Sequence, residues 1–261
     1  MNVSPRNVAI DAARDAGRIL RDRYGNVQQI KYKGEVDIVT DVDEASERLI
    51  VDRIHQYFPD HQILGEESGS SRSPDTGSNH RWIIDPLDGT TNFAHGYPFF
   101  CVSIGLEVAG EMQLGAVYAP VFDELFVAER GVGAFLNGRR ISVSKTDSLI
   151  RSLMATGFNY DRELARENLQ HWERLTVRTQ ALRRDGSSAL NLCFVAAGRF
   201  DAYWEIGLKP WDLAAGSLMV REAGGQVTNF AGEPHQMSHR NLLSSNGVLH
   251  ADMLDALNES A

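Results

Sequence analysis

Two aspartates, Asp85 and Asp88, follow the apolar residues 82–84 and precede the segment Gly89-Thr90-Thr91. The β-branched apolar run predicts a buried strand, and the Gly-Thr-Thr segment predicts the beginning of a short helix. Carboxylate oxygens are the ligands that Mg²⁺ prefers, and free amides at a helix start favour phosphate. Together these preferences indicate a phosphate ester as substrate. The alternative is that both aspartates only stabilise a turn and a helix cap.

Further acidic residues occupy similar positions elsewhere in the chain. Glu66 and Glu67 lie in Gly-Glu-Glu-Ser directly after a short apolar segment, and Asp212 lies in Trp-Asp-Leu-Ala-Ala-Gly, which begins a later predicted helix. The same placement at a strand end or a helix start therefore occurs three times, which favours a metal site over isolated caps.

Three motifs together resemble those of the inositol monophosphatase family, and its bacterial, SuhB-like members are the nearest group. They are the Gly-Glu-Glu at 65–67, the Asp-Pro-Leu-Asp-Gly-Thr-Thr-Asn-Phe at 85–93, and the Trp-Asp-Leu-Ala-Ala-Gly at 211–216, followed by Ala-Gly-Gly at 223–225. They stand in the family's order, and the match spans nearly the whole chain. The resemblance implies an α/β (α+β) fold, a five-layered α-β-α-β-α sandwich of the inositol monophosphatase and fructose-1,6-bisphosphatase type.

The resemblance also implies a ligand set for two or three Mg²⁺ ions. Glu66, Asp85 and the Leu87 carbonyl would hold one ion, and Asp85, Asp88 and Asp212 would hold a second. A third, weaker ion would lie near Glu66. Four carboxylates in a small cleft cannot all stay ionised without cations, because like charges at close range oppose one another.

The implied reaction is hydrolysis of inositol monophosphate by a metal-activated water, without a covalent phosphoenzyme. Glu66 and Thr90 would act in catalysis, with Asp43 orienting Thr90 so that it holds or deprotonates the water. The amides of Gly89 and Thr90 would bind phosphate oxygens. The nearby residues that the resemblance implies as modulators are Lys33, Asp37 and Glu67.

The substrate side of the site rests on the same resemblance. Glu205 precedes Asp212 by the spacing of a hydroxyl-binding acid, and residues 186–188 correspond to the segment along the polyol ring. A helix N-cap explains residues 186–188 about equally well. Arg183 and Arg184 could face substrate, a subunit interface or water. The complete set of expected substrate contacts is Asp88, Gly89, Thr90, Gly186, Ser187, Ser188, Glu205 and Asp212.

Composition limits the class of protein. The 261 residues are 43% hydrophobic and carry a net charge of -9, which fits a soluble globular protein and argues against direct binding of nucleic acid or anionic membranes. Cys101 and Cys193 lie in apolar surroundings and are expected to be buried, reduced thiols. The absence of a signal region and of a membrane-spanning run predicts a cytoplasmic protein. The resemblance adds a homodimer, lithium sensitivity and a small phosphorylated polyol as substrate.

We expect one domain over 1–261, with a strand-rich metal-binding half at 1–148 and an α/β half at 149–261 that completes the site. Asn137-Gly138 is typical of a hairpin before a strand at 141–143. A turn is expected at 33–35. Helices are predicted at 5–25, 41–58, 162–179, 186–198, 212–223 and near the C-terminus. Further strands are predicted at 31–32, 37–40, 62–64, 82–84, 101–107, 112–119, 124–130, 153–156, 200–206 and 242–244.

Other readings of the same residues are possible. A haloacid-dehalogenase-type phosphatase needs two aspartates separated by two positions, whereas Asp85 and Asp88 are separated by three, so this reading is weak. Phosphatases for fructose-1,6-bisphosphate, histidinol phosphate or adenosine 3',5'-bisphosphate share the metal core and stay open as alternatives. A regulatory protein that binds the transcription machinery is the alternative outside catalysis.

Overall fold

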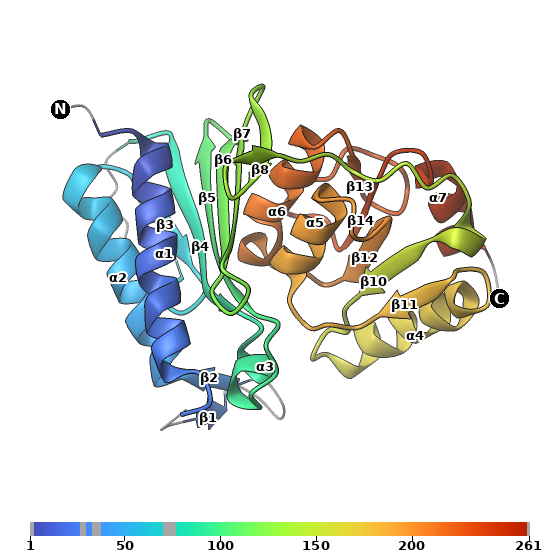
Figure 1. Ribbon diagram of the computed structural model, residues 1–261, viewed down its shortest axis with the longest axis horizontal. Helices are drawn as coiled ribbons and strands as arrows, with labels where there is room; N and C mark the ends of the chain where they lie inside the picture. The colour runs from blue at the N-terminus through green and yellow to red at the C-terminus, as the bar shows by residue number, and fades with distance from the viewer. Residues whose placement is uncertain (1–2, 27–29, 33–37, 70–76, 260–261) are drawn as a thin grey trace.

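The computed structural model describes residues 3–26, 30–32, 38–69 and 77–259. Its secondary structure is stacked in five layers, α-β-α-β-α, as Figure 1 shows from left to right. Helices α1 (Pro5–Arg23) and α2 (Asp41–Tyr57) form the first layer, α5 (Ser188–Ala196) and α6 (Pro210–Glu222) the middle one, and α4 (Arg162–Thr176) and α7 (His250–Asn258) the last. The predicted fold class is confirmed.

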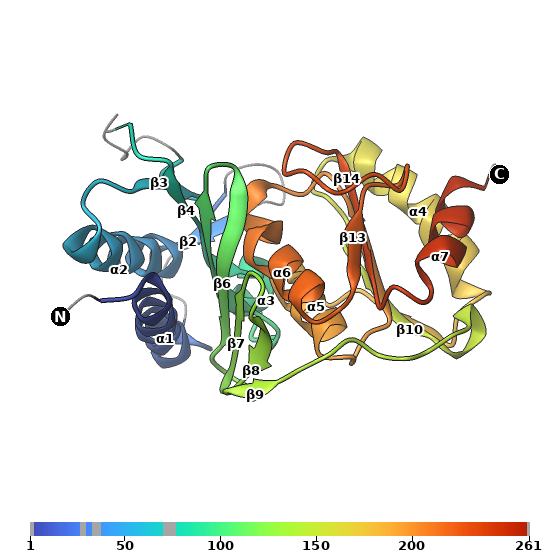
Figure 2. The same cartoon turned by 90° about the horizontal axis from the view of Figure 1, so that it is seen from above.

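Two sheets separate these helical layers. The seven-stranded sheet has the order β3-β4-β5-β6-β7-β8-β9, and the five-stranded sheet has the order β11-β10-β12-β14-β13. Figure 2 shows the segment after β9 crossing from the first sheet to the second, where it enters β10. The strands of the first sheet are β3 (Gln62–Gly65), β4 (His80–Asp88), β5 (Cys101–Val108), β6 (Glu111–Ala119), β7 (Glu124–Glu129), β8 (Gly133–Leu136) and β9 (Arg139–Arg140). Those of the second are β10 (Leu153–Thr156), β11 (Ala181–Arg183), β12 (Ala202–Ile206), β13 (Gln226–Thr228) and β14 (Asn241–Ser245).

A small antiparallel ribbon precedes α2. Its strands are β1 (Ile30–Tyr32) and β2 (Ile38–Thr40), and the turn predicted at 33–35 lies outside the described residues. Thr40 ends the ribbon and caps α2, because its Oγ1 accepts from the Val42 amide at 3.2 Å. Asp43 in the first turn of α2 accepts from the Thr40 amide at 2.8 Å and from the Thr40 hydroxyl at 2.5 Å. These contacts hold the Asp43 carboxylate in one place.

Strand β4 carries a bulge at the end where the first motif lies. Asp85 pairs with Ser103 of β5 and Asp88 pairs with Cys101, so three steps along β4 oppose two along β5. A bulge of this kind bends the strand and re-aims its side chains. Both Asp85 and Asp88 are thereby buried on the side of the sheet that faces the middle layer.

The middle helices are apolar on nearly all sides because both neighbours are sheets. Seven residues of α5 and eight of α6 are buried, most of them aliphatic. Helix α6 approaches the first sheet closely at Gly115, where an added Cβ would meet the Ala215 carbonyl at 2.9 Å. Cys101 and Cys193 are buried, free thiols in the same core, as predicted.

Some predicted elements differ from the structure. The Asn137-Gly138 hairpin is present, with φ of 48° and 77°, but it joins β8 to the two-residue β9. The strand predicted at 141–143 is wrong. The Ile141 amide makes a last contact with the sheet at the Ala134 carbonyl, 2.9 Å away, and the Val143 amide then donates to the Ala223 carbonyl at 3.1 Å. Helix α4 ends at Thr176 instead of 179, and the short edge strands β11 and β13 were not predicted. Across the described residues, we find no helix with the length and apolar character needed to cross a membrane.

Candidate active site

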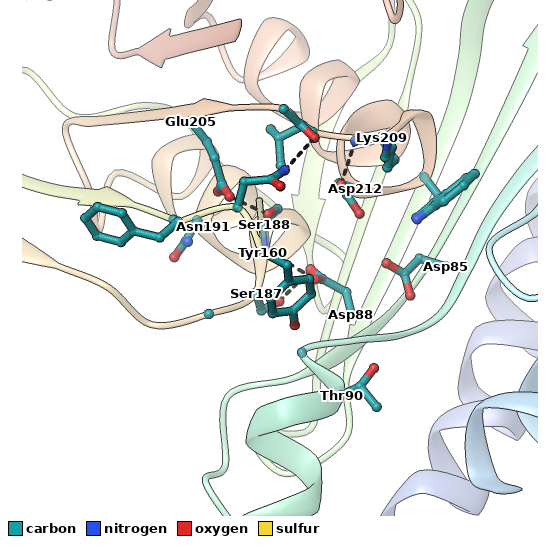
Figure 3. A pocket seen from close by; sticks show the side chains of 18 of the residues that line it. Asp85, Asp88, Thr90, Tyr160, Ser187, Ser188, Asn191, Glu205, Lys209 and Asp212 are labelled. Carbon is teal, nitrogen blue, oxygen red and sulfur yellow. Dashed lines mark hydrogen bonds between the residues drawn. The ribbon is translucent and has the colours of Figure 1, made fainter. Parts of the chain in front are cut away.

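A cavity of about 400 Å³ lies where the end of β4, the short helix α3 (Thr90–Ala94) and the starts of α5 and α6 meet. Figure 3 shows Asp85, Asp88 and Asp212 pointing toward the same space, with Glu205 at the other end of the cavity. The structure thus brings together acids from both halves of the chain. The sequence-predicted residues that line the cavity are Glu66, Asp85, Leu87, Asp88, Gly89, Thr90, Gly186, Ser187, Ser188, Glu205 and Asp212.

Asp85 is buried, and the charges of three other acidic side chains act on it. Its Oδ1 accepts from the Leu87 amide at 3.0 Å, and among the described residues its Oδ2 accepts no hydrogen bond. Burial raises the pKa of this carboxyl well above its usual range, and the charges of Glu66, Asp88 and Asp212 raise it further. The protein alone therefore opposes ionisation of Asp85, and a cation would favour it.

Asp88 is held by the start of α5. Its Oδ2 accepts from the Ser187 hydroxyl at 2.6 Å and from the Ala189 amide at 2.7 Å, and its Oδ1 accepts from the Ser188 amide at 3.3 Å. Burial raises the pKa of Asp88, while these hydrogen bonds counteract the rise. Ser187 is also the N-cap of α5, accepting from the Leu190 amide at 3.4 Å. The cap alternative for residues 186–188 is thus present geometrically, together with their place along the cavity wall.

Asp212 lies in the first turn of α6. Its Oδ2 accepts from the Lys209 amide at 2.7 Å, while Oδ1 accepts no hydrogen bond from the described residues. Burial raises the pKa of Asp212 well above its usual range, and the charge of Asp88 adds to the rise. Helix α6 began two residues before the predicted start, so Pro210 occupies its first turn.

Thr90 links the cavity to Asp43. Its Oγ1 lies 3.0 Å from Asp43 Oδ1 and 3.0 Å from the Leu87 carbonyl oxygen, so the hydroxyl can donate to either acceptor. Asp43 is fully buried and is absent from the described lining of the cavity, and it contacts Thr90, which is part of that lining. Burial raises the pKa of Asp43, and its hydrogen bonds from Thr40 and Thr90 oppose this rise.

Gly89 shapes the start of α3. Its φ of 99° suits glycine, and an added Cβ would meet the Phe99 carbonyl oxygen at 3.0 Å. Thr90 is the first residue of α3, so its amide has no acceptor within the helix. The backbone at Gly89 and Thr90 is therefore open to an anion at the cavity wall.

Glu205 forms the opposite end of the cavity. Its Oε2 accepts from the Tyr203 hydroxyl and, at 3.4 Å, from the Ser188 hydroxyl. Burial raises the pKa of Glu205 to about 7, against the hydrogen bond from Tyr203. Gly157 leaves room for this carboxyl, because an added Cβ would overlap its oxygens.

Several wall residues were missed by sequence reasoning. Residues 157–160 follow β10 directly, so their position after a predicted strand was the available signal. Asn191 lies inside α5, and its buried Oδ1 has no hydrogen-bond partner among the described residues. The missed residues in the wall are Gly157, Phe158, Asn159, Tyr160, Asn191, Gly207, Leu208, Lys209 and Trp211.

Of the remaining residues named from the sequence, Arg184 lines the cavity and the others lie apart from it or outside the described residues. Lys33 and Asp37 belong to the undescribed residues. Glu67 does not line the cavity, and its amide donates to Glu47 Oε2 at 2.9 Å. Arg184 lines the cavity, whereas Arg183 is exposed and donates to the Leu182 carbonyl.

The donor types suit a hard divalent cation. Five carboxylates line the cavity against two cationic side chains, Arg184 and Lys209, among the described lining residues. As the carboxylates stand, no three His, Cys, Asp or Glu side chains in the described part of the chain are arranged to hold a metal ion. Asp88 is held toward the start of α5 by its hydrogen bonds from Ser187 and Ala189.

Comparison with known proteins identifies the class of protein to which the five-layered fold and the acid-lined cavity belong. The sequence profile of the inositol monophosphatase family matches residues 2–261, so the chain belongs to this family. The resemblance found in the motifs is thereby confirmed, and the family supports a phosphatase.

Individual relatives carry two kinds of name. The chain is 46% identical over 252 residues to inositol-1-monophosphatase of Synechocystis sp., covering 96% of this chain and 87% of that protein. It is 42% identical over 246 residues to Nus factor SuhB of Pseudomonas aeruginosa, covering 92% and 90%. The crystal structure of extragenic suppressor protein suhB from Bartonella henselae matches with a TM-score of 0.93 at 42% identity, covering 98% of each chain.

Because the acidic side chains of the cavity repel one another, we expect Asp212→Asn to stabilise the metal-free protein. The asparagine keeps an oxygen for the Lys209 amide and removes one half-buried negative charge. A gain of about 1 kcal/mol would raise the melting temperature in EDTA by roughly 2–4 °C. A raised pKa of Asp212 means that folding favours the protonated acid, so the wild type loses stability as pH rises. The difference in melting temperature between Asp212→Asn and the wild type therefore widens as pH rises.

The control is Asp147→Asn, which neutralises an exposed aspartate outside the cavity and should leave the melting temperature unchanged. The opposite result would be a lower melting temperature for Asp212→Asn in EDTA at every pH above the ordinary aspartate range. It would show that the neighbouring charges do not oppose the charge of Asp212.

Proposed function

We propose that the protein is a Mg²⁺-dependent phosphoric monoester hydrolase that converts inositol monophosphate to inositol and phosphate. The observation that supports it most directly is the gathering of Glu66, Asp85, Asp88 and Asp212 around one cavity beside the start of α3. Residues 1–148 contribute three of these acids and residues 149–261 the fourth, so we treat 1–261 as one functional domain.

The proposed metal ligands follow the donor set of the cavity. Glu66, Asp85 and the Leu87 carbonyl would hold one ion, Asp85, Asp88 and Asp212 a second, and a third, weaker ion would lie near Glu66. Bound Mg²⁺ supplies positive charge that neutralises these carboxylates and polarises the phosphoryl group and the attacking water. The mutual rise in pKa among Asp85, Asp88 and Asp212 supports a cation as their partner.

The chain itself would position the water and the phosphoryl group. Asp43 accepts from the Thr90 hydroxyl, so the Thr90 oxygen can in turn accept from the attacking water and orient it. The amides of Gly89 and Thr90 would donate to phosphoryl oxygens. A water nucleophile makes a covalent phosphoenzyme unnecessary.

The other end of the cavity would bind the polyol. Glu205 would accept from one ring hydroxyl, and Ser188 and the backbone at Gly186 would contact the ring edge. Ser187 would act through Asp88, since its hydroxyl donates to that carboxylate. Two or three hydroxyl contacts of this kind distinguish a polyol phosphate from a simple alkyl phosphate.

The Thr90–Asp43 pair gives a test of the water-positioning step. Thr90→Val and Asp43→Asn should each lower kcat by about 10²-fold or more, with KM little changed, since positioned proton acceptors contribute roughly 10²–10⁴-fold. The double variant should lose little more than either single one, because both changes remove the same contact. Steady-state phosphate release in saturating Mg²⁺ measures this.

Thr91→Val is the matched control, because its hydroxyl faces Tyr160 at 3.3 Å and does not contact Asp43. Its kcat should stay within about twofold of the wild type. Multiplicative losses in the Thr90 and Asp43 double variant would mean that the two residues act independently and that the proposed positioning is wrong.

A substrate panel tests the specificity. With Mg²⁺, kcat/KM should be highest for inositol monophosphate and lower for fructose-1,6-bisphosphate, histidinol phosphate and adenosine 3',5'-bisphosphate. Turnover should disappear in EDTA and fall in lithium. Equal kcat/KM on all four substrates would defeat the inositol preference while leaving the phosphatase intact, and a preference for another substrate would select that alternative.

A regulatory role is the second candidate, and the relatives named Nus factor SuhB favour it. The partner would be a protein of the transcription machinery, since a net charge of -9 argues against direct contact with nucleic acid. Asp88→Asn should abolish turnover by weakening the second metal position. If Asp88→Asn abolishes the phenotype of a cell that depends on this gene, catalysis is the biological role; a retained phenotype assigns the role to binding.

We further propose a cytoplasmic homodimer.

A further inference from the structure

A second cavity, of about 720 Å³, lies away from the acid-lined site. Its wall includes Arg81 at the start of β4, whereas Asp85 and Asp88 lie further along the same strand, roughly 13 and 23 Å away. Helix α6 contributes to both cavities, with Asp212 in the first and Ser217 and Arg221 in the second. The volume is in the range of sites that hold small organic ligands.

Three buried polar atoms in this wall have no hydrogen-bond partner among the described residues. They are Arg81 Nε, Ser217 Oγ and His235 Nε2. The Ser217 and His235 residues are only 5% and 8% exposed. Buried polar groups in folded proteins are nearly always satisfied, so three unsatisfied atoms around one cavity point to a polar ligand.

Among the described residues, three arginines and three glutamates line the wall, and Arg221 is the guanidinium left for an anionic group on the ligand. Arg81 pairs with Glu107, and the Glu222 carboxylate accepts from the Gly131 amide at 2.9 Å. Arg221 donates to the His235 carbonyl at 3.1 Å and, within the described part of the chain, forms no ion pair with a carboxylate. Arg130 is its neighbour in the wall and adds a second guanidinium, which is paired with Glu111. Guanidinium groups bind phosphate and carboxylate oxygens in a planar, two-pronged geometry.

The rest of the wall limits the shape and polarity of the ligand. Leu213, Leu218 and Met237 provide apolar surface. Burial and the charges of His239 and Arg221 lower the pKa of His235 to about 4, so its ring is neutral at neutral pH and Nε2 can pair with a hydroxyl or amino group. Arg81 pairs with Glu107 through its terminal nitrogen and keeps Nε for a ligand.

We propose that this cavity binds a small organic oxyanion, a phosphate or carboxylate on a compact and partly apolar body. The oxyanion lies against Arg221 and Arg130, and a polar substituent reaches Ser217 and His235. The site is separate from the acid-lined cavity and takes a ligand that is not hydrolysed there.

Calorimetric titration of the full-length protein in EDTA tests this, with phenylphosphonate and benzoate as probes. Metal-free conditions matter because the uncompensated carboxylates of the first cavity then repel anions. Saturable binding is expected, and Arg221→Gln should weaken it at least tenfold and Ser217→Ala by threefold or more. Arg166→Gln, which removes an exposed arginine of α4, and Asp88→Asn, in the first cavity, should leave the dissociation constant unchanged.

The two probes separate the sources of the oxyanion. Binding of both supports the shared chemistry, and binding of one alone assigns the site to phosphates or to carboxylates. No saturable binding of either probe overturns the proposal, as does binding that Asp88→Asn weakens and Arg221→Gln does not. Circular dichroism checks each variant, and Arg130→Gln replaces Arg221→Gln if the latter does not fold. A crystal soaked with phenylphosphonate should show density beside Arg221.

Discussion

The structure depends on acidic side chains that the fold buries close together against their electrostatic preference. Burial disfavours the charged form of each carboxyl, and the remaining charges in the cavity disfavour it again. Such an arrangement persists only where the surrounding core fixes the side chains more strongly than their repulsion separates them. Here the β4 bulge, the start of α5 and the first turn of α6 supply that restraint.

The two helices of the middle layer position the residues of the acid-lined cavity. Helix α5 directs its first amides and the Ser187 hydroxyl at Asp88, which belongs to the other half of the chain. Helix α6 presents Asp212 to the same cavity, and its close contact at Gly115 holds it against the first sheet. The geometry of the cavity is therefore set by how both helices pack between the sheets.

Most of the acid set and of the layer order could be predicted from the sequence. Apolar runs, caps and strand ends are local signals, and the long motif around Asp85 and Asp88 adds the resemblance that fixes their relation to Asp212. The strand expected at 141–143 does not form, because the Val143 amide donates to the Ala223 carbonyl. This is a contact between distant segments that a local pattern does not reveal. Edge strands β11 and β13 were missed because three residues carry too little pattern.

Residues of the cavity wall without a charge were harder to find. Gly157 matters because the Glu205 carboxyl occupies the space of its absent Cβ, and nothing near Gly157 in the sequence indicates this. Asn191 lies among apolar residues of α5, where a lone amide resembles any satisfied core asparagine until the cavity beside it is known. Such residues are defined by tertiary distances and not by local pattern.

The helices between the two sheets are encoded late in the chain, at 188–196 and 210–222, although one of their faces covers strands made much earlier. During translation, the seven-stranded sheet therefore leaves the ribosome with its inner apolar face still bare. The covering helices follow only later, since α5 begins 48 residues and α6 begins 70 residues after the end of β9 at Arg140. Over this interval the uncovered apolar strands expose the nascent chain to aggregation.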